Sequence, residues 1–210
     1  MAHRRNRRKP LVRVLIYVEG GSQGSTKSAC RQAFRLFLEK AIPPGSFQVI
    51  ACGSRAEAFQ DFRAALKSHP SAYIILLVDS EGIVSTGPWT HLRTRVGDGW
   101  HQPSGTTDDQ AHLMVQVMES WFLADRNILI AYYGKNFRAS SLPRRSNVEL
   151  IPKHDVFRAL EHASRKTLKG PYHKTKHAFD LLEMIDPTLV RAASAHAGRL
   201  FKVLLQAARR

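Results

Sequence analysis

The chain has 210 residues, 43% of them hydrophobic and 23% charged, which is typical of a soluble globular protein with one substantial core. No apolar run is long enough to span a bilayer, and the N-terminal region lacks the apolar stretch and cleavage site of a secretory signal. The two isolated cysteines, Cys30 and Cys52, exclude a disulfide framework and a zinc site, so a reducing, cytoplasmic location is expected.

Lysine and arginine outnumber aspartate and glutamate by 32 to 17, which gives a net charge of +15. Residues 3–9 hold five of these charges and no acid, so the rest of the chain carries +10. A basic body favours a polyanionic partner, and nucleic acid explains it better than solubility does, because acids serve solubility better. No segment has a basic face opposite tryptophan and leucine, so binding to a membrane is not expected.

The first part of the chain alternates between strand-like and helix-like patterns. After a basic tail over residues 1–10, apolar runs rich in β-branched residues predict strands, and apolar residues at helical spacing predict helices. The strands are predicted over 12–18, 47–52 and 73–78, and the helices over 26–40 and 56–67. This order predicts an α/β fold of the Rossmann-like kind, with a mainly parallel sheet flanked by helices and right-handed crossovers.

The pattern then changes twice. Residues 82–110 are rich in glycine, proline, serine and threonine, with one short helical candidate over 89–95, and a segment this long and irregular indicates a functional loop. Residues 113–118 suit a helix or a strand. The alternation within them favours a strand that passes into a helix at Glu119, with a break at Asp125, which is a good N-cap residue.

The remainder of the chain is predicted to be helical. One helix is expected after Asp155 and ends before Gly170, and residues 175–184 and 187–209 together give two or three more. Proline at position 187, directly after an aspartate, is a typical helix start. The predicted organisation is therefore a basic tail over 1–10, an α/β core over 11–140 and a helical C-terminal region over 141–210 packed on that core.

Acidic residues follow three of the apolar stretches at the point where each stretch ends. Glu19 follows the first strand, Asp79 and Glu81 follow the third, and Glu119 follows residues 113–118. Ligands of open α/β sheets bind just outside the carboxyl ends of the strands, so these acids can converge there. Several oxygen ligands in one crevice are what Mg²⁺ requires. The pattern predicts a site for Mg²⁺ or Mn²⁺ held by the first three of these acids.

Each acid also has a plainer interpretation. Glu19 could cap the following helix, although the serine and threonine at 25–26 lie closer to its start. Asp79 and Glu81 could be solvated loop acids, but they share one face of an extended segment, and such like charges raise each other's pKa unless a cation separates them. Glu119 lies in an apolar stretch and needs a partner, which could be lysine or arginine instead of a metal.

These motifs resemble a known fold. The sequence VEG at 18–20, followed by VDSE at 78–81, resembles the Toprim fold, which has a glutamate after its first strand and a D-x-D pair after its third. The sequence LMVQVMESWFLAD at 113–125 is similar to the M-E-x-W-x-L-A-D signature of a Toprim-like bacterial family of unknown function, as are residues 169–179 and 185–187. One departure is Glu81 in place of the second aspartate. It reaches about one bond farther with the same oxygens, so Mg²⁺ ligation is retained with a changed geometry.

The resemblance implies a Toprim core that binds Mg²⁺, akin to the overcoming-lysogenization-defect nucleases, which act with AAA or SMC-like ATPases in phage defence. The expected function is therefore metal-dependent cleavage of phosphodiester bonds in DNA or RNA. Asp79 and Glu81 would hold Mg²⁺, and Glu19 would ligate a second ion or accept a proton from the attacking water. Glu119 would complete the site or orient a ligand.

Four lysines of the helical region are candidates to bind the phosphates of the substrate, with a solvated helix face as the equal alternative. They are Lys166, Lys169, Lys174 and Lys176.

Other classes of function remain open beside the nuclease. The chain could be a non-catalytic module that binds nucleic acid or an ATPase through a degenerate Toprim site, or an effector that stays silent until a partner releases it. A binding module should show no response to Mg²⁺ and should lose affinity steeply with salt. Each of these interpretations is compatible with a homo-oligomer.

Overall fold

The computed structural model describes residues 14–21 and 24–209, so the predicted basic tail over 1–10 lies outside the described residues. Four parallel strands form one sheet in the order β2–β1–β3–β4. They are β1 (Val14–Glu19), β2 (Phe47–Gly53), β3 (Tyr73–Asp79) and β4 (Ala111–Met114). This arrangement confirms the predicted α/β class with a parallel sheet.

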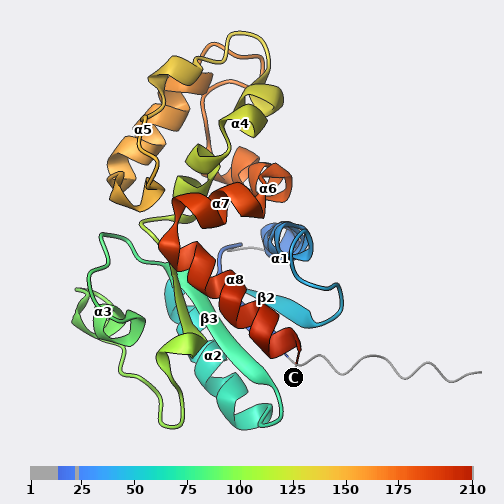
Figure 1. The fold of residues 1–210 in the computed structure, drawn as a ribbon, viewed down its shortest axis with the longest axis vertical. Helices are drawn as coiled ribbons and strands as arrows, with labels where there is room; N and C mark the ends of the chain where they lie inside the picture. The colour runs from blue at the N-terminus through green and yellow to red at the C-terminus, as the bar shows by residue number, and fades with distance from the viewer. Residues whose placement is uncertain (1–13, 22–23, 210) are drawn as a thin grey trace, which may run out of the picture.

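Helices cover both faces of the sheet because the strands are apolar on both sides. Val14, Ile16 and Val18 of β1 face one hydrophobic cluster, whereas Leu15 and Tyr17 face the other, as the alternation of a strand requires. The helices α1 (Gly24–Glu39) and α8 (Ala195–Ala208) belong to the first cluster, and α2 (Arg55–Ser68) and α3 (Pro88–Thr94) to the second. Figure 1 looks onto α8 where it crosses the sheet.

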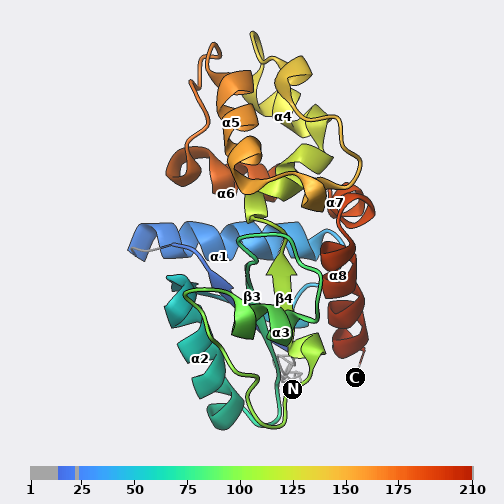
Figure 2. The same ribbon diagram turned by 90° about the vertical axis from the view of Figure 1, so that its left-hand side faces the viewer.

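The remaining helices form the opposite end of the molecule. They are α4 (Arg126–Tyr133), α5 (Lys153–Ser164), α6 (Lys174–Met184) and α7 (Pro187–Ala193). In Figure 2, α1 lies between the sheet and the end of the molecule formed by α4 and α5, and α6 packs against α1. The first hydrophobic cluster extends from Val14 to Ala207, so the helical region and the sheet share one core. No described helix is long and apolar enough to cross a membrane.

Two local expectations are wrong. The fourth strand ends at Met114 and not at 118, although the chain stays beside β3, because Gln116 accepts a backbone hydrogen bond from Glu81 at 2.8 Å. The chain then enters a 3₁₀ helix over Met118–Ala124 instead of an α-helix. Asp155 lies inside the first turn of α5 instead of preceding it, because this helix begins two residues earlier, at Lys153.

Two predicted caps are confirmed. The side chain of Asp125 accepts from the backbone N–H of Ile128 at 3.2 Å and starts α4. The side chain of Asp186 accepts from Thr188 at 2.7 Å and starts α7 with proline at its first position. Short polar side chains at these points satisfy backbone donors that have no partner inside the helix.

A buried carboxylate joins the helical region to the start of α8. Oε1 of Glu149 accepts from the Ser194 hydroxyl at 2.6 Å and from the backbone N–H of His196 at 2.8 Å, and Oε2 lies 3.0 Å from Nδ1 of His196. Burial alone would raise the pKa of Glu149, but the hydrogen bonds from His196 and Ser194 outweigh it and lower the pKa.

We expect Glu149→Gln to lower the free energy of unfolding by about 1–3 kcal/mol, because the amide cannot replace the charged acceptor. The stability that this carboxylate contributes is complete above its unfolded pKa of about 4.3 and is lost as the pH falls through the lower folded pKa. Denaturant titrations at neutral pH and below pH 4 should show the difference between variant and wild type shrinking at low pH. The exposed Glu161→Gln is the control, and an equal effect of both variants would contradict the prediction.

Candidate metal centre

Three acids meet at the carboxyl edge of the sheet. Glu19 is the last residue of β1 and Asp79 is the last residue of the neighbouring strand β3. Glu81 follows two residues later with a φ of 64°. One carboxylate oxygen from each of the three residues lies within 4.8 Å of the others. The structure therefore brings together the three acids that the sequence selects as metal ligands.

Burial and neighbouring negative charges both raise the pKa of Asp79, the central acid of the three. Asp79 is 3% exposed, its Oδ1 accepts from the backbone N–H of Met118 at 2.7 Å, and its own backbone N–H donates to Oε1 of Glu19 at 3.0 Å. Burial raises the pKa of Asp79 well above its ordinary value, and the charges of Glu19 and Glu119 raise it further. A cation bound among these carboxylates would relieve that repulsion.

The fourth predicted acid, Glu119, lies behind the three and not among them. It is fully buried in the 3₁₀ helix over Met118–Ala124, and its Oε1 accepts from the Tyr172 hydroxyl at 2.9 Å. Its Oε2 is buried without a hydrogen-bond partner. Nζ of Lys174 lies 3.8 Å from Glu119 and 3.9 Å from Asp79, so this lysine links the fourth acid to the centre.

Arginine and lysine side chains hold two of the three acids. Nη1 of Arg55 lies 3.3 Å from Oε2 of Glu19 and also donates to the backbone carbonyl of Asp79. Two further hydrogen bonds, of 2.9 and 2.7 Å, fix this guanidinium on Asp98 in the long loop between β3 and β4. Lys153, at the start of α5, pairs with Glu81.

Arg55 and Lys153 were not among the predicted site residues. The sequence could have indicated Arg55, because this residue follows β2 and so lies at the same edge of the sheet as the acids. Lys153 had no such signal, because α5 reaches the site only through tertiary packing. Tyr172 lies in the stretch 169–179 that resembles the family motif, but the sequence does not indicate its contact with Glu119.

The acids open into a cleft of about 400 Å³ between the sheet edge and the first turns of α1 and α6. Charged side chains line one part of it, and Met114, Met118 and Phe179 line another. The turn between β1 and α1 comes this close to the acids because Gly21 has a φ of +73° and no side chain. A Cβ there would lie 2.6 Å from the backbone of Lys27.

The elements that build this cleft lie within a family match over residues 18–205, whose description is Domain of unknown function (DUF4276). The chain belongs to the DUF4276 family. No curated protein and no solved structure matches the chain. The matched range runs from the last residues of β1 into α8, so it contains every acid of the candidate centre of this DUF4276 protein.

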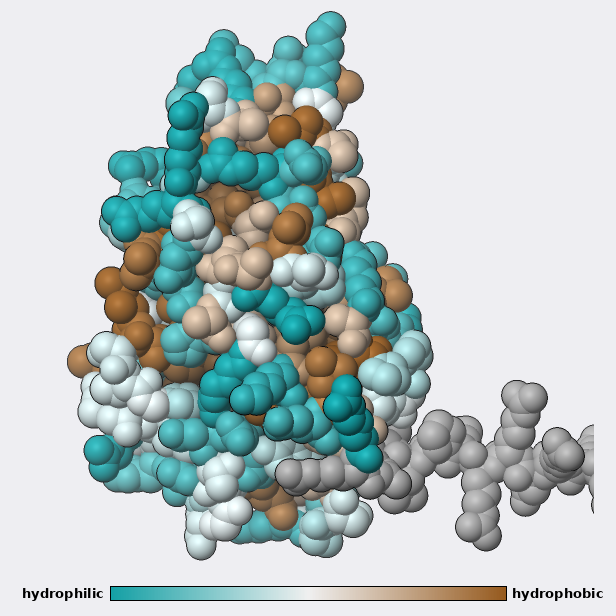
Figure 3. All heavy atoms as spheres, viewed as in Figure 1, coloured by the Kyte–Doolittle hydropathy of each residue, from teal (hydrophilic) through white to brown (hydrophobic). Residues whose placement is uncertain are grey.

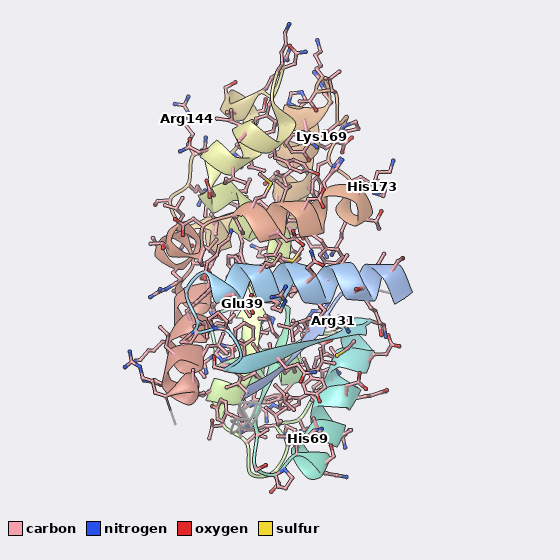
Figure 4. All side chains as sticks on the ribbon, turned by 90° about the vertical axis from the view of Figure 1, so that its right-hand side faces the viewer. Arg31, Glu39, His69, Arg144, Lys169 and His173 are labelled. Carbon is pink, nitrogen blue, oxygen red and sulfur yellow. The ribbon has the colours of Figure 1, made fainter. Side chains whose placement is uncertain are left out.

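The four predicted phosphate-binding lysines have different positions in the DUF4276 fold. Lys174 lines the cleft, with its side chain 59% exposed, and although burial opposes its charge, Glu119 and Asp79 raise its pKa overall. Lys166, Lys169 and Lys176 are exposed and do not line the cleft. Nζ of Lys169 lies 4.3 Å from the centre of the Tyr132 ring, and Figure 4 shows this lysine on the helical end of the molecule.

The residues present fit a divalent cation. The donor set of the DUF4276 centre is entirely carboxylate, which is the oxygen chemistry that Mg²⁺ and Mn²⁺ prefer. Burial, and after it the charges of Glu19 and Glu119, raise the pKa of Asp79, and Oε2 of Glu119 is buried without a hydrogen-bond partner, so a cation bound here would be stabilising. Glu19, Asp79 and Glu81 are the residues that would hold the ion.

Proposed function

We propose that this DUF4276 protein is a Mg²⁺- or Mn²⁺-dependent nuclease of the Toprim type that hydrolyses phosphodiester bonds in nucleic acid. The convergence of Glu19, Asp79 and Glu81 at the carboxyl edge of the sheet carries the proposal. The resemblance of the motifs at 18–20 and 78–81 to the Toprim fold, and of residues 113–125 to a Toprim-like family of unknown function, supports it. The same resemblance supports a role in phage defence with an ATPase partner in the cytoplasm.

The bound ion would polarise the phosphate and make water a stronger nucleophile. Glu19 would ligate a second ion or accept the proton of that water, since it lines the cleft and its side chain is 13% exposed. Lys174 is protonated and reaches the cleft from α6, where it can bind a phosphate oxygen. Arg55 keeps Glu19 oriented toward the centre through its contact at 3.3 Å.

A cleavage assay tests this proposal. Purified protein should nick or degrade DNA or RNA in the presence of Mg²⁺ or Mn²⁺, and an excess of chelator should stop the reaction. Cleavage that continues at full rate in chelator would show that the acids do not act through a metal. Both polymers should be tried in single- and double-stranded form, because the acids do not select among them.

One observation favours a second function, a module that binds nucleic acid or an ATPase without cleaving. Arg55 and Lys153 already pair with Glu19 and Glu81, so two of the three acids have protein cations as partners. In such a module these pairs would replace the metal permanently. Calorimetric titration with Mn²⁺ separates the two functions, because a nuclease should bind the ion and a module of this kind should not.

A further inference from the structure

Among the residues that the structure describes, the positive charge is concentrated in one part of the fold. Residues 126–176, here called the basic lobe, contain twelve lysines and arginines against three acids, a net charge of +9. Residues 14–125, which form the sheet and the helices around it, contain nine against eleven, a net charge of −2. The expected basic body is therefore a basic lobe attached to a slightly acidic core.

Most of the cations of this lobe have no acidic partner. Lys153, Arg158 and Lys174 form ion pairs, whereas the other nine lysines and arginines form none with any described residue. Strongly hydrophilic side chains project from this end of the molecule in Figure 3, and Figure 4 places Arg144 and Lys169 on it. A concentration of unpaired charge on one lobe is the electrostatic signature of a surface that binds a polyanion.

The lobe also carries a groove of about 650 Å³ along α5. Its floor is apolar and includes Leu142, Pro143 and Ile151, and its sides carry Arg145 and Arg158. The one acid that lines it, Asp155, already pairs with Arg158. An apolar floor between cationic sides suits a ligand that has flat apolar rings attached to phosphates.

The groove lies near the acidic cleft. Lys153 contacts Glu81 of the cleft, and its neighbours Pro152 and Asp155 line the groove, so the first turn of α5 borders both. The groove and the acidic cleft therefore lie close to each other at the first turn of α5.

We infer that the basic lobe is the surface that binds the substrate and that a single strand of nucleic acid lies along the α5 groove, with its phosphates on the arginines and unpaired bases on the apolar floor. The inference rests on the proposed function in one respect, namely that the bound strand runs from the groove toward the three acids where it would be cleaved. The binding itself does not depend on cleavage. A membrane surface would use the same cations but has no need for the groove.

The test measures binding in chelator, so that cleavage plays no part. The probe is a fluorescent single-stranded DNA oligonucleotide, and its affinity is measured over a range of salt concentrations. The lobe variant Arg144→Gln/Arg145→Gln/Arg165→Gln removes three exposed cations that have no acidic partner. The control variant Lys67→Gln/Arg93→Gln/Lys202→Gln removes three exposed cations from α2, α3 and α8, none of which lines the cleft or the groove.

The lobe variant should bind roughly 100-fold more weakly at 0.1 M salt, and the slope of log K against log salt should fall by about 2, since each lost phosphate contact contributes about 0.7. The control variant should bind like the wild type. The triple substitution of the same arginines by lysine should restore most of the slope, which separates loss of charge from misfolding.

Equal loss in the lobe and control variants would overturn the inference, as would a duplex of the same sequence that binds as tightly as the single strand. Anionic phosphatidylserine vesicles form the last comparison. If the lobe variant loses vesicle binding but keeps oligonucleotide binding, the surface binds membrane and the inference is wrong. Absence of cleavage with intact, lobe-dependent binding would contradict only the proposed nuclease function.

Discussion

Replacing Asp79 with asparagine should abolish metal-dependent cleavage while leaving the fold intact. The backbone N–H of Met118 donates to Oδ1 of Asp79 at 2.7 Å, and an amide oxygen accepts this bond equally well. The neutral amide is a weaker ligand, and a metal centre contributes several kcal/mol to the transition state. A loss of about 4 kcal/mol corresponds to a rate roughly 1000-fold lower, which a cleavage time course in Mn²⁺ will measure.

Asp61→Asn is the matched control, because it makes the same chemical change on the exposed side of α2, outside the cleft. Its rate should equal that of the wild type. If the Asp79 variant cleaves nucleic acid within a few-fold of the wild-type rate, the acids at the sheet edge are not the catalytic centre. Circular dichroism of both variants should match that of the wild type.

The same substitution should make the protein more stable when no divalent metal is present. The pKa of Asp79 is raised by burial and by Glu19 and Glu119, so between its ordinary and raised values the folded protein binds a proton that the unfolded chain releases. Wild-type stability therefore falls as the pH rises through that window, and the asparagine variant avoids the loss. In chelator near neutral pH, its melting temperature should be higher, by about 2–4 °C for each kcal/mol gained.

Adding Mn²⁺ should reduce or reverse the difference in melting temperature between the asparagine variant and the wild type. The wild type should gain stability from the ion by mass action, and the variant should gain much less. Differential scanning calorimetry with and without Mn²⁺ follows both proteins. A variant that is less stable than the wild type in chelator would contradict the argument from buried charge, and equal stabilisation of both proteins would place the ion elsewhere.

The sequence was sufficient to predict those features that follow from the pattern of apolar residues and from the topology of a parallel sheet. Apolar runs located β1, β2 and β3, and the position of ligands at the carboxyl edge of a parallel sheet then brought Glu19, Asp79 and Glu81 together. The same reasoning failed at β4, because Val115 and Val117 continue the alternation of a strand after the strand itself has ended.

The partners of the acids could not be predicted in the same way. Lys153 and Tyr172 lie 72 and 53 residues along the chain from the acids that they contact, so only tertiary packing determines these contacts. It packs α5 and α6 on the 3₁₀ helix over Met118–Ala124 that carries Glu119. The predicted boundary between the core and the helical region also divided the basic lobe. Dividing the chain at residue 141 separates α4 from α5, although both belong to the basic end of the molecule.

The difference in charge between the basic lobe, at +9, and residues 14–125, at −2, gives the described part of the molecule an electric dipole. In the field of a polyanion such a molecule turns before contact, so that encounters occur with the α4–α5 end in front. The rate of association should then depend strongly on ionic strength, whereas the rate of any later chemical step should not. Stopped-flow measurements at two salt concentrations would compare the two rates. A rate of association that falls with salt, beside an unchanged chemical rate, would show that the overall charge distribution orients the molecule, and not any single contact.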